Sequence, residues 1–203
     1  MMDPRTPTFK AIKAARNGRS YSSDEVLDVH ALLDRLGVPR ESHRPPSAGQ
    51  LHASAAAIAL IKEFEGLQLR SYLCPAKVWT IGYGATGPGI GPGVEWTIEQ
   101  AERRILADIA AVEEGVRFLI GSKRTSQGQF DALVSFAYNC GTDIDSDHTP
   151  EGLGDSTLLL KHLTGDYAGA AAEFGKWVNG GGRRLEGLVR RRKREAALYG
   201  QAA

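Results

Sequence analysis

Three side chains between Glu65 and Thr80 have the chemistry needed to cleave a bond to oxygen. Glu65 carries a carboxyl group, Cys74 a thiol and Thr80 a hydroxyl, in a stretch rich in glycine and aromatic residues. A protonated carboxyl group can act as a general acid on a leaving oxygen, such as that of a glycosidic bond. A thiol and a hydroxyl can hold an attacking water, or the thiol can attack directly. The three residues are therefore a candidate catalytic set.

The local sequence predicts that Glu65 ends a helix. Gly66 follows it directly and is a typical residue after a helix C-terminus. The partial negative charge of that helix end disfavours a carboxylate, and the apolar neighbours Phe64 and Leu67 would disfavour it further by desolvation. We expect Glu65 to keep a proton near neutral pH. The alternative is an ordinary solvated glutamate at a helix end.

Thr80 falls in a predicted hairpin. Residues 69–90 combine β-branched and aromatic residues with many glycines, which is typical of strands joined by sharp turns. In a strand, Thr80 and Gly82 share one face, opposite Trp79 and Ile81. The alternatives are a threonine that only builds the strand and a Cys74 that only fills space in the core.

The elements that would hold these residues are mostly helical. Capping boxes begin at Thr97 and Ser126. Helices are predicted at 51–64, 97–120, 130–140, 156–163, 167–178 and 185–199, with a polar loop at 142–154. The predicted fold class is α+β, mostly helical, with one small β-hairpin sheet and a helical bundle.

The composition excludes several functions. The 203 residues have a net charge of +1, so no overall field favours nucleic acid, and no apolar run is long enough for a membrane span. The first residues lack the apolar core of a secretory signal. Two cysteines make no disulfide framework, which favours a reduced cytoplasmic origin. The five histidines show no metal-ligand spacing, and we expect neither a metal nor a cofactor.

Several ordered motifs resemble the phage-type muramidases of glycoside hydrolase family 24. Eight residues separate Glu65 from Cys74, and five separate Cys74 from Thr80, which is that family's catalytic spacing. The resemblance covers roughly residues 54–199 and includes WTIGYG at 79–84, QFDALVSFAYNCG at 129–141, the segment 155–178 and GLVRRRKRE at 187–195. It implies a lysozyme-like fold. Two positions differ, because Cys74 replaces the more usual Asp and Ala85 stands where His is common.

The resemblance implies hydrolysis of the β-1,4 bond between N-acetylmuramic acid and N-acetylglucosamine in peptidoglycan. Glu65 would be the general acid, and Cys74 and Thr80 would position the water. We expect Tyr83, Gly84 and Asn139 to contact the sugar chain. An amide at Asn139 suits N-acetyl and hydroxyl groups, although a capping role is an equal alternative.

The absence of a second acid limits the mechanism. A retaining glycosidase needs a second carboxylate about 5 Å from the acid, and no Asp or Glu occurs between Glu65 and Glu95. With a thiol of reference pKa about 8.5 at Cys74, we expect direct attack by water with inversion. Two alternatives stay open: a lytic transglycosylase that leaves 1,6-anhydro ends, and a non-catalytic wall-binding virion protein.

The C-terminal helix is strongly basic. We expect Arg190, Arg191, Arg192 and Arg194 to contact the acidic surface of the cell wall. The alternative is a solvated helix end. Nucleic acid is disfavoured because no aromatic residues are interleaved with these charges.

Two domains are predicted, with residues 1–50 forming a small helical N-terminal extension and linker, and 51–203 the lysozyme-like catalytic domain. Helices at 9–17 and 22–36 precede a proline-containing linker at 38–50, and the extension either binds the wall or packs on the main domain.

The other expectations are a monomer, peptidoglycan as the partner, and no stable membrane insertion. The protein would be made in the bacterial cytoplasm and reach the wall through a holin lesion.

Overall fold

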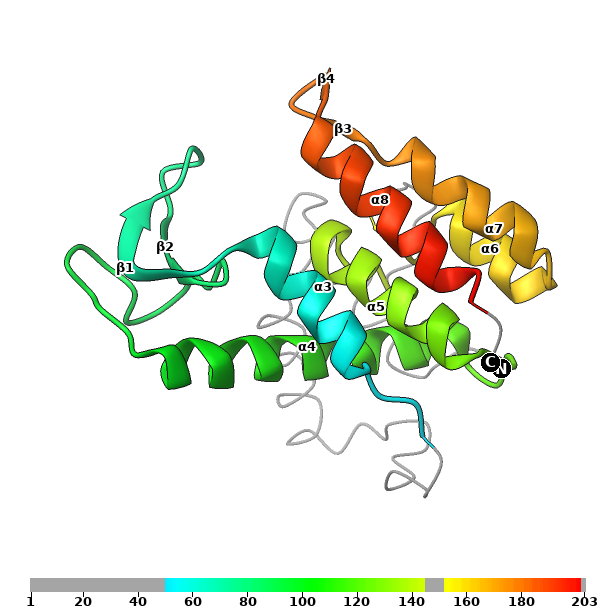
Figure 1. Cartoon of the computed structure of the whole chain (residues 1–203), viewed down its shortest axis with the longest axis horizontal. Coiled ribbons are helices and arrows are strands. Elements are labelled where there is room, and N and C mark those ends of the chain that lie inside the picture. The colour runs from blue at the N-terminus through cyan, green and yellow to red at the C-terminus, as the bar shows by residue number, and fades with distance from the viewer. Residues whose placement is uncertain (1–49, 145–151, 202–203) are drawn as a thin grey trace, which may run out of the picture.

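The computed structural model describes residues 50–144 and 152–201, so the helices expected at 9–17 and 22–36 lie outside it (Figure 1). The helices are α3 (Ala55–Glu65), α4 (Ile98–Ile120), α5 (Gln127–Cys140), α6 (Thr157–Thr164), α7 (Tyr167–Glu173), the 3-10 helix η1 (Phe174–Lys176) and α8 (Glu186–Tyr199). The strands are β1 (Gln68–Leu73), β2 (Trp79–Gly82), β3 (Asn179–Gly180) and β4 (Arg183–Arg184). The predicted class, α+β and mostly helical, is confirmed.

Helix α3 begins at Ala55 rather than at Leu51 because the preceding backbone is bound elsewhere. The Ala53 amide donates to Glu113 Oε1 at 2.7 Å, and the Ser54 amide donates to Asp131 Oδ1 at 2.9 Å. Ser54 then caps the helix by accepting a hydrogen bond from the Ala57 amide. These bonds fix the start of α3 against α4 and α5.

Strands β1 and β2 form the expected antiparallel hairpin, with Tyr72 opposite Thr80 and Leu73 opposite Trp79. A bulge interrupts the register between Gln68 and Tyr72. The other edge of β1 is also bonded, because the Trp96 amide donates to the Leu69 carbonyl at 2.8 Å. Strand β1 is therefore bonded along both of its edges.

Helix α5 occupies the middle of the molecule. Figure 1 shows α4 running beneath it, α3 beside it and the α6–α7–α8 group on the side away from the β1–β2 hairpin. Every residue from Phe130 to Ala137 is buried. Helix α4 contributes one apolar stripe at helical spacing, including Ile105, Ile109 and Val116. The core is thus built around α5, and α3 and α8 both lie against it.

The helix predicted at 167–178 ends earlier in the structure, and a second hairpin that was not predicted follows it. Helix α7 ends at Glu173, and a second hairpin, β3–β4, precedes α8. Its turn residues Gly181 and Gly182 have φ values of 57° and 75°, which suit glycine in a tight hairpin turn. This short hairpin sets the start of α8. None of the described helices is long and apolar enough to cross a membrane.

Candidate active site

Glu65 is the last residue of α3, as expected, but its surroundings are not the apolar ones that the sequence predicts. Its Oε1 atom lies 2.6 Å from Nη1 of Arg191, which reaches it from α8. The apolar neighbour Phe64 faces the same guanidinium, with 5.7 Å between its ring centroid and Arg191 Cζ. The Glu65 side chain is 22% exposed, so it is reachable from solvent while fixed by a cation.

Arg191 is itself buried and fixed. Its Nε atom lies 3.1 Å from Glu195 Oε1, and its Nη2 donates to the Ser135 carbonyl oxygen at 3.2 Å. The Ser135 hydroxyl donates to the same Glu195 oxygen at 2.7 Å. Burial raises the pKa of Glu195, whereas the adjacent guanidiniums and the Ser135 hydroxyl act against that rise.

The end of the β1–β2 hairpin approaches Glu65 at Gly84. A methyl carbon added to Gly84 would lie 3.8 Å from Glu65 Oε2, and the backbone there has a φ of 91°. The neighbouring Tyr83 hydroxyl donates to Glu102 Oε1 at 2.8 Å, and Lys62 of α3 pairs with the same carboxylate. Burial, followed by the contact with Glu102, raises the pKa of Tyr83. This junction ties the hairpin to α3 and α4.

Cys74 and Thr80 lie together in the hairpin. The Thr80 hydroxyl donates to the Val78 carbonyl at 3.1 Å, and Thr80 is 5% exposed. Hydrogen bonding from the Val78 backbone, followed by that from Ala76 and the Thr80 hydroxyl, lowers the pKa of the half-buried Cys74 thiol against the opposing effect of burial. The Cys74 thiol therefore ionises more readily than the reference pKa used in the sequence analysis implies.

Asn139 is exposed at the C-terminal end of α5. Its Oδ1 atom accepts a hydrogen bond from Arg192 Nη2 at 2.7 Å. Arg192 Nη1 also contacts the Cys140 sulfur at 3.1 Å. Asn139 is thus held by α8, as Glu65 is.

The predicted wall contact is wrong for two of the four arginines. Arg191 and Arg192 are only 2% and 1% exposed, because both are turned inward to pair with Glu195. Arg190 and Arg194 are exposed, and Arg194 pairs with Glu63 at 3.2 Å. Glu195 and Ser135 were not predicted from the sequence. A signal was present, since Glu195 follows the two arginines at helical spacings of four and three residues.

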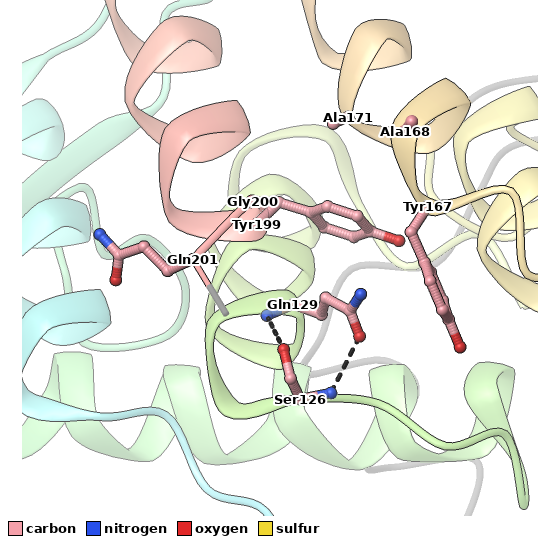
Figure 2. Close-up of a pocket in the computed structure, with 8 residues that line it drawn as sticks. All are labelled: Ser126, Gln129, Tyr167, Ala168, Ala171, Tyr199, Gly200 and Gln201. Carbon is pink, nitrogen blue, oxygen red and sulfur yellow. Dashed lines mark hydrogen bonds between the residues drawn. The ribbon is translucent and has the colours of Figure 1, made fainter. Parts of the chain in front are cut away.

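A cavity of about 370 Å³ lies elsewhere, at the N-terminal end of α5. Figure 2 shows Ser126 and Gln129 bonded to each other on one side, with the rings of Tyr167 and Tyr199 nearby. The Tyr167 hydroxyl donates to the Arg124 carbonyl, and the Tyr199 hydroxyl bonds to His162. The polar groups that line this cavity therefore serve helix capping and packing. None of the predicted catalytic residues lines the cavity.

In the described ranges, no group of three or more His, Cys, Asp or Glu side chains is arranged to hold a metal ion.

Comparison with known proteins places this fold among the phage lysozymes. Residues 62–195 match the phage lysozyme family. In the muramidase domain of SpmX from Asticaccaulis excentricus, the fold is similar with a TM-score of 0.65 and 31% identity, covering 75% of this chain and 99% of that one. The endolysin of Escherichia coli O157:H7 phage FAHEc1 gives a TM-score of 0.63 and 34% identity, covering 74% and 94%.

The chain belongs to the phage lysozyme family. It is 43% identical over 152 residues to the endolysin of Bacillus phage PZA, covering 73% of this chain and 55% of that one. It is 41% identical over 156 residues to the endolysin of Acyrthosiphon pisum secondary endosymbiont phage 1, covering 75% and 100%. The matched region therefore spans about half of the first relative and all of the second. The lysozyme-like fold expected from the sequence is confirmed.

Proposed function

We propose that this protein is an endolysin that hydrolyses the β-1,4 bond between N-acetylmuramic acid and N-acetylglucosamine in peptidoglycan. The observation that carries the proposal is the position of Glu65. This carboxyl group ends α3, is partly open to solvent, contacts Arg191 at 2.6 Å and faces the hairpin at Gly84. Membership of the phage lysozyme family supports the substrate class.

In this mechanism Glu65 transfers its proton to the glycosidic oxygen as the bond from that oxygen to the sugar carbon breaks. Arg191 stabilises the carboxylate that forms, since an adjacent guanidinium favours the charged product of the proton transfer. Cys74 and Thr80 hold the water that attacks the sugar carbon from the opposite face; this water loses one proton to the solvent, from which Glu65 is protonated again. Tyr83, Gly84 and Asn139 contact the sugar chain.

Mass spectrometry of digested peptidoglycan tests the reaction directly. Hydrolysis gives new reducing ends at N-acetylmuramic acid. A lytic transglycosylase would give 1,6-anhydro ends, because the sugar's own hydroxyl replaces water. That second candidate is supported by the single carboxylate, Glu65, in the stretch 65–94, and a product mixture made only of anhydro ends would replace hydrolysis with it.

Cys74 should be needed for the rate. We expect Cys74→Ser to lower turnover roughly 100-fold, in the range of a lost acid–base or water-orienting group, because serine lacks the thiolate character that Val78 and Thr80 promote. Cys74→Asp should keep substantial activity, since Asp is the more usual residue there. The measurement is release of reducing ends from purified sacculi.

Alkylation offers a matched control for the same prediction. A thiol reagent should inactivate the wild type and spare Cys74→Asp, which retains Cys140. Near-normal turnover of Cys74→Ser would show that the thiol is dispensable. A sugar covalently attached to Cys74 would contradict direct attack by water.

The exposed arginines of α8 provide a proposed contact with the wall surface. Replacing both Arg190 and Arg194 with Gln should weaken binding to purified sacculi and flatten its decrease with added salt, because exposed charges are screened by ions. Arg103→Gln, which removes an exposed arginine from α4, is the control and should leave the salt profile unchanged. An identical salt profile for the double variant and the wild type would exclude the contact.

The wall-binding or packing role of residues 1–50, the monomeric state and release through a holin stay predictions from the sequence.

A further inference from the structure

Four charged side chains form a connected cluster between α8 and the two helix ends of the site. Glu195 is fully buried on α8, between Arg191 at 3.1 Å and Arg192 at 2.9 Å. Arg191 continues to Glu65 at 2.6 Å. The cluster thus contains two positive and two negative groups, and Glu65 is its exposed end.

The two arginines that contact Glu195 extend to different parts of the site. Arg191 reaches Glu65 at the end of α3, whereas Arg192 donates to Asn139 at the end of α5 at 2.7 Å. Arg192 also lies over the Phe136 ring, with 4.8 Å from its Cζ to the ring centroid. Glu195 therefore contacts both the arginine that holds Glu65 and the arginine that holds Asn139.

We propose that Glu195 is a positioning residue that orients Glu65 through Arg191 and Asn139 through Arg192. The proposal rests on the proposed function, because it takes Glu65 as the general acid. Glu195 also sets the charge that Glu65 meets, since it balances one of the two adjacent buried cations. Without that charge, one of the two guanidiniums would be left uncompensated in a buried site.

The Glu195→Gln variant tests this role because it keeps the shape of the side chain and removes its charge. We expect turnover to fall roughly 10- to 100-fold, as a small displacement of a catalytic group does. We also expect the alkaline limb of the rate–pH profile to move to lower pH. The reason is that the Arg191 guanidinium beside Glu65 loses part of its compensating charge, and a more positive surrounding favours the carboxylate product of the proton transfer.

Glu173→Gln is the matched control. Glu173 is a buried carboxylate, 3% exposed, held between Lys161 at 2.7 Å and Lys176 at 2.8 Å, and it contacts no proposed site residue. It should lower the melting temperature without moving the rate–pH profile. Glu195→Asp should restore the wild-type profile, because it restores the charge, while keeping a reduced turnover because its shorter side chain holds the arginines less well.

Glu65→Gln, measured alongside, separates the two proposals. If Glu65→Gln keeps normal activity, the assignment of the general acid is wrong. If Glu65→Gln is inactive but Glu195→Gln, assayed below its melting temperature, keeps the wild-type turnover and rate–pH profile, the positioning role of Glu195 is wrong. A loss of turnover in Glu195→Gln with an unmoved profile, equal to that of Glu173→Gln, would also overturn it.

Discussion

Glu65→Gln should abolish measurable lysis, with a loss of roughly 100- to 10,000-fold, the usual contribution of a general acid. The amide has the same shape as the carboxyl group and can still accept a hydrogen bond from Arg191, so α3 should keep its position. It has no acidic proton to give to the glycosidic oxygen. The loss should therefore appear in turnover rather than in binding to sacculi.

Turbidity of a cell-wall suspension and reducing-end release measure this loss. Glu114→Gln, an exposed glutamate of α4, serves as the control and should lyse like the wild type. Normal lysis by Glu65→Gln would remove Glu65 from the mechanism. Equal and negligible lysis by the wild type and Glu65→Gln would instead favour a non-catalytic wall-binding protein.

Acid should destabilise the fold by about 3 kcal/mol through His162 alone. This side chain is fully buried, with its ring nitrogens 2.6 Å from the Tyr199 hydroxyl and 2.9 Å from the Thr125 hydroxyl. Burial, with a smaller contribution from Lys123, lowers the pKa of His162 to about 4. An unfolded histidine has a pKa of about 6.5, and each unit of difference corresponds to about 1.4 kcal/mol.

Stability falls with falling pH because the unfolded and folded states take up this proton at different pH values. Between about pH 6.5 and about pH 4 the unfolded chain binds a proton at this position and the folded protein does not, so unfolding becomes easier as the pH falls. Below about pH 4 both states are protonated and the full loss has occurred. At neutral pH both are unprotonated, and His162 contributes no such loss.

Denaturant unfolding at a series of pH values measures this effect. His162→Gln should be less stable than the wild type at neutral pH, but the gap should close by about 3 kcal/mol on acidification. Tyr199→Phe removes the bonded hydroxyl and leaves the buried imidazole, so it should lower stability while keeping the acid-dependent drop. Parallel curves for the wild type and His162→Gln would contradict the prediction.

Local signals in the sequence predicted the elements that they specify. The capping boxes at Thr97 and Ser126 both form, and α4 and α5 begin directly after them. Glu65 ends α3, and Thr80 lies in the first hairpin, because a glycine after a helix and alternating β-branched residues act over a few positions. These features need no information from distant parts of the chain.

Contacts between distant residues could not be predicted in the same way. The run of arginines at 190–192 reads as a solvated basic face, and only the folded α8 shows that Arg191 and Arg192 turn inward to Glu195. The partner of Glu65 is 126 residues away in sequence. Gly181 and Gly182 lie in the gap between the helices predicted at 167–178 and 185–199, and the sequence did not predict that this gap forms the β3–β4 hairpin.

The pairing of Glu65 with Arg191 also determines when during synthesis the site can be completed. A ribosome makes α3 early and α8 near the end, and Arg191 follows Glu65 by 126 positions in the chain. A nascent chain, or a fragment cut short before α8, has the acid without its cation and without Glu195. C-terminal truncations that remove α8 should therefore behave as complete losses of function.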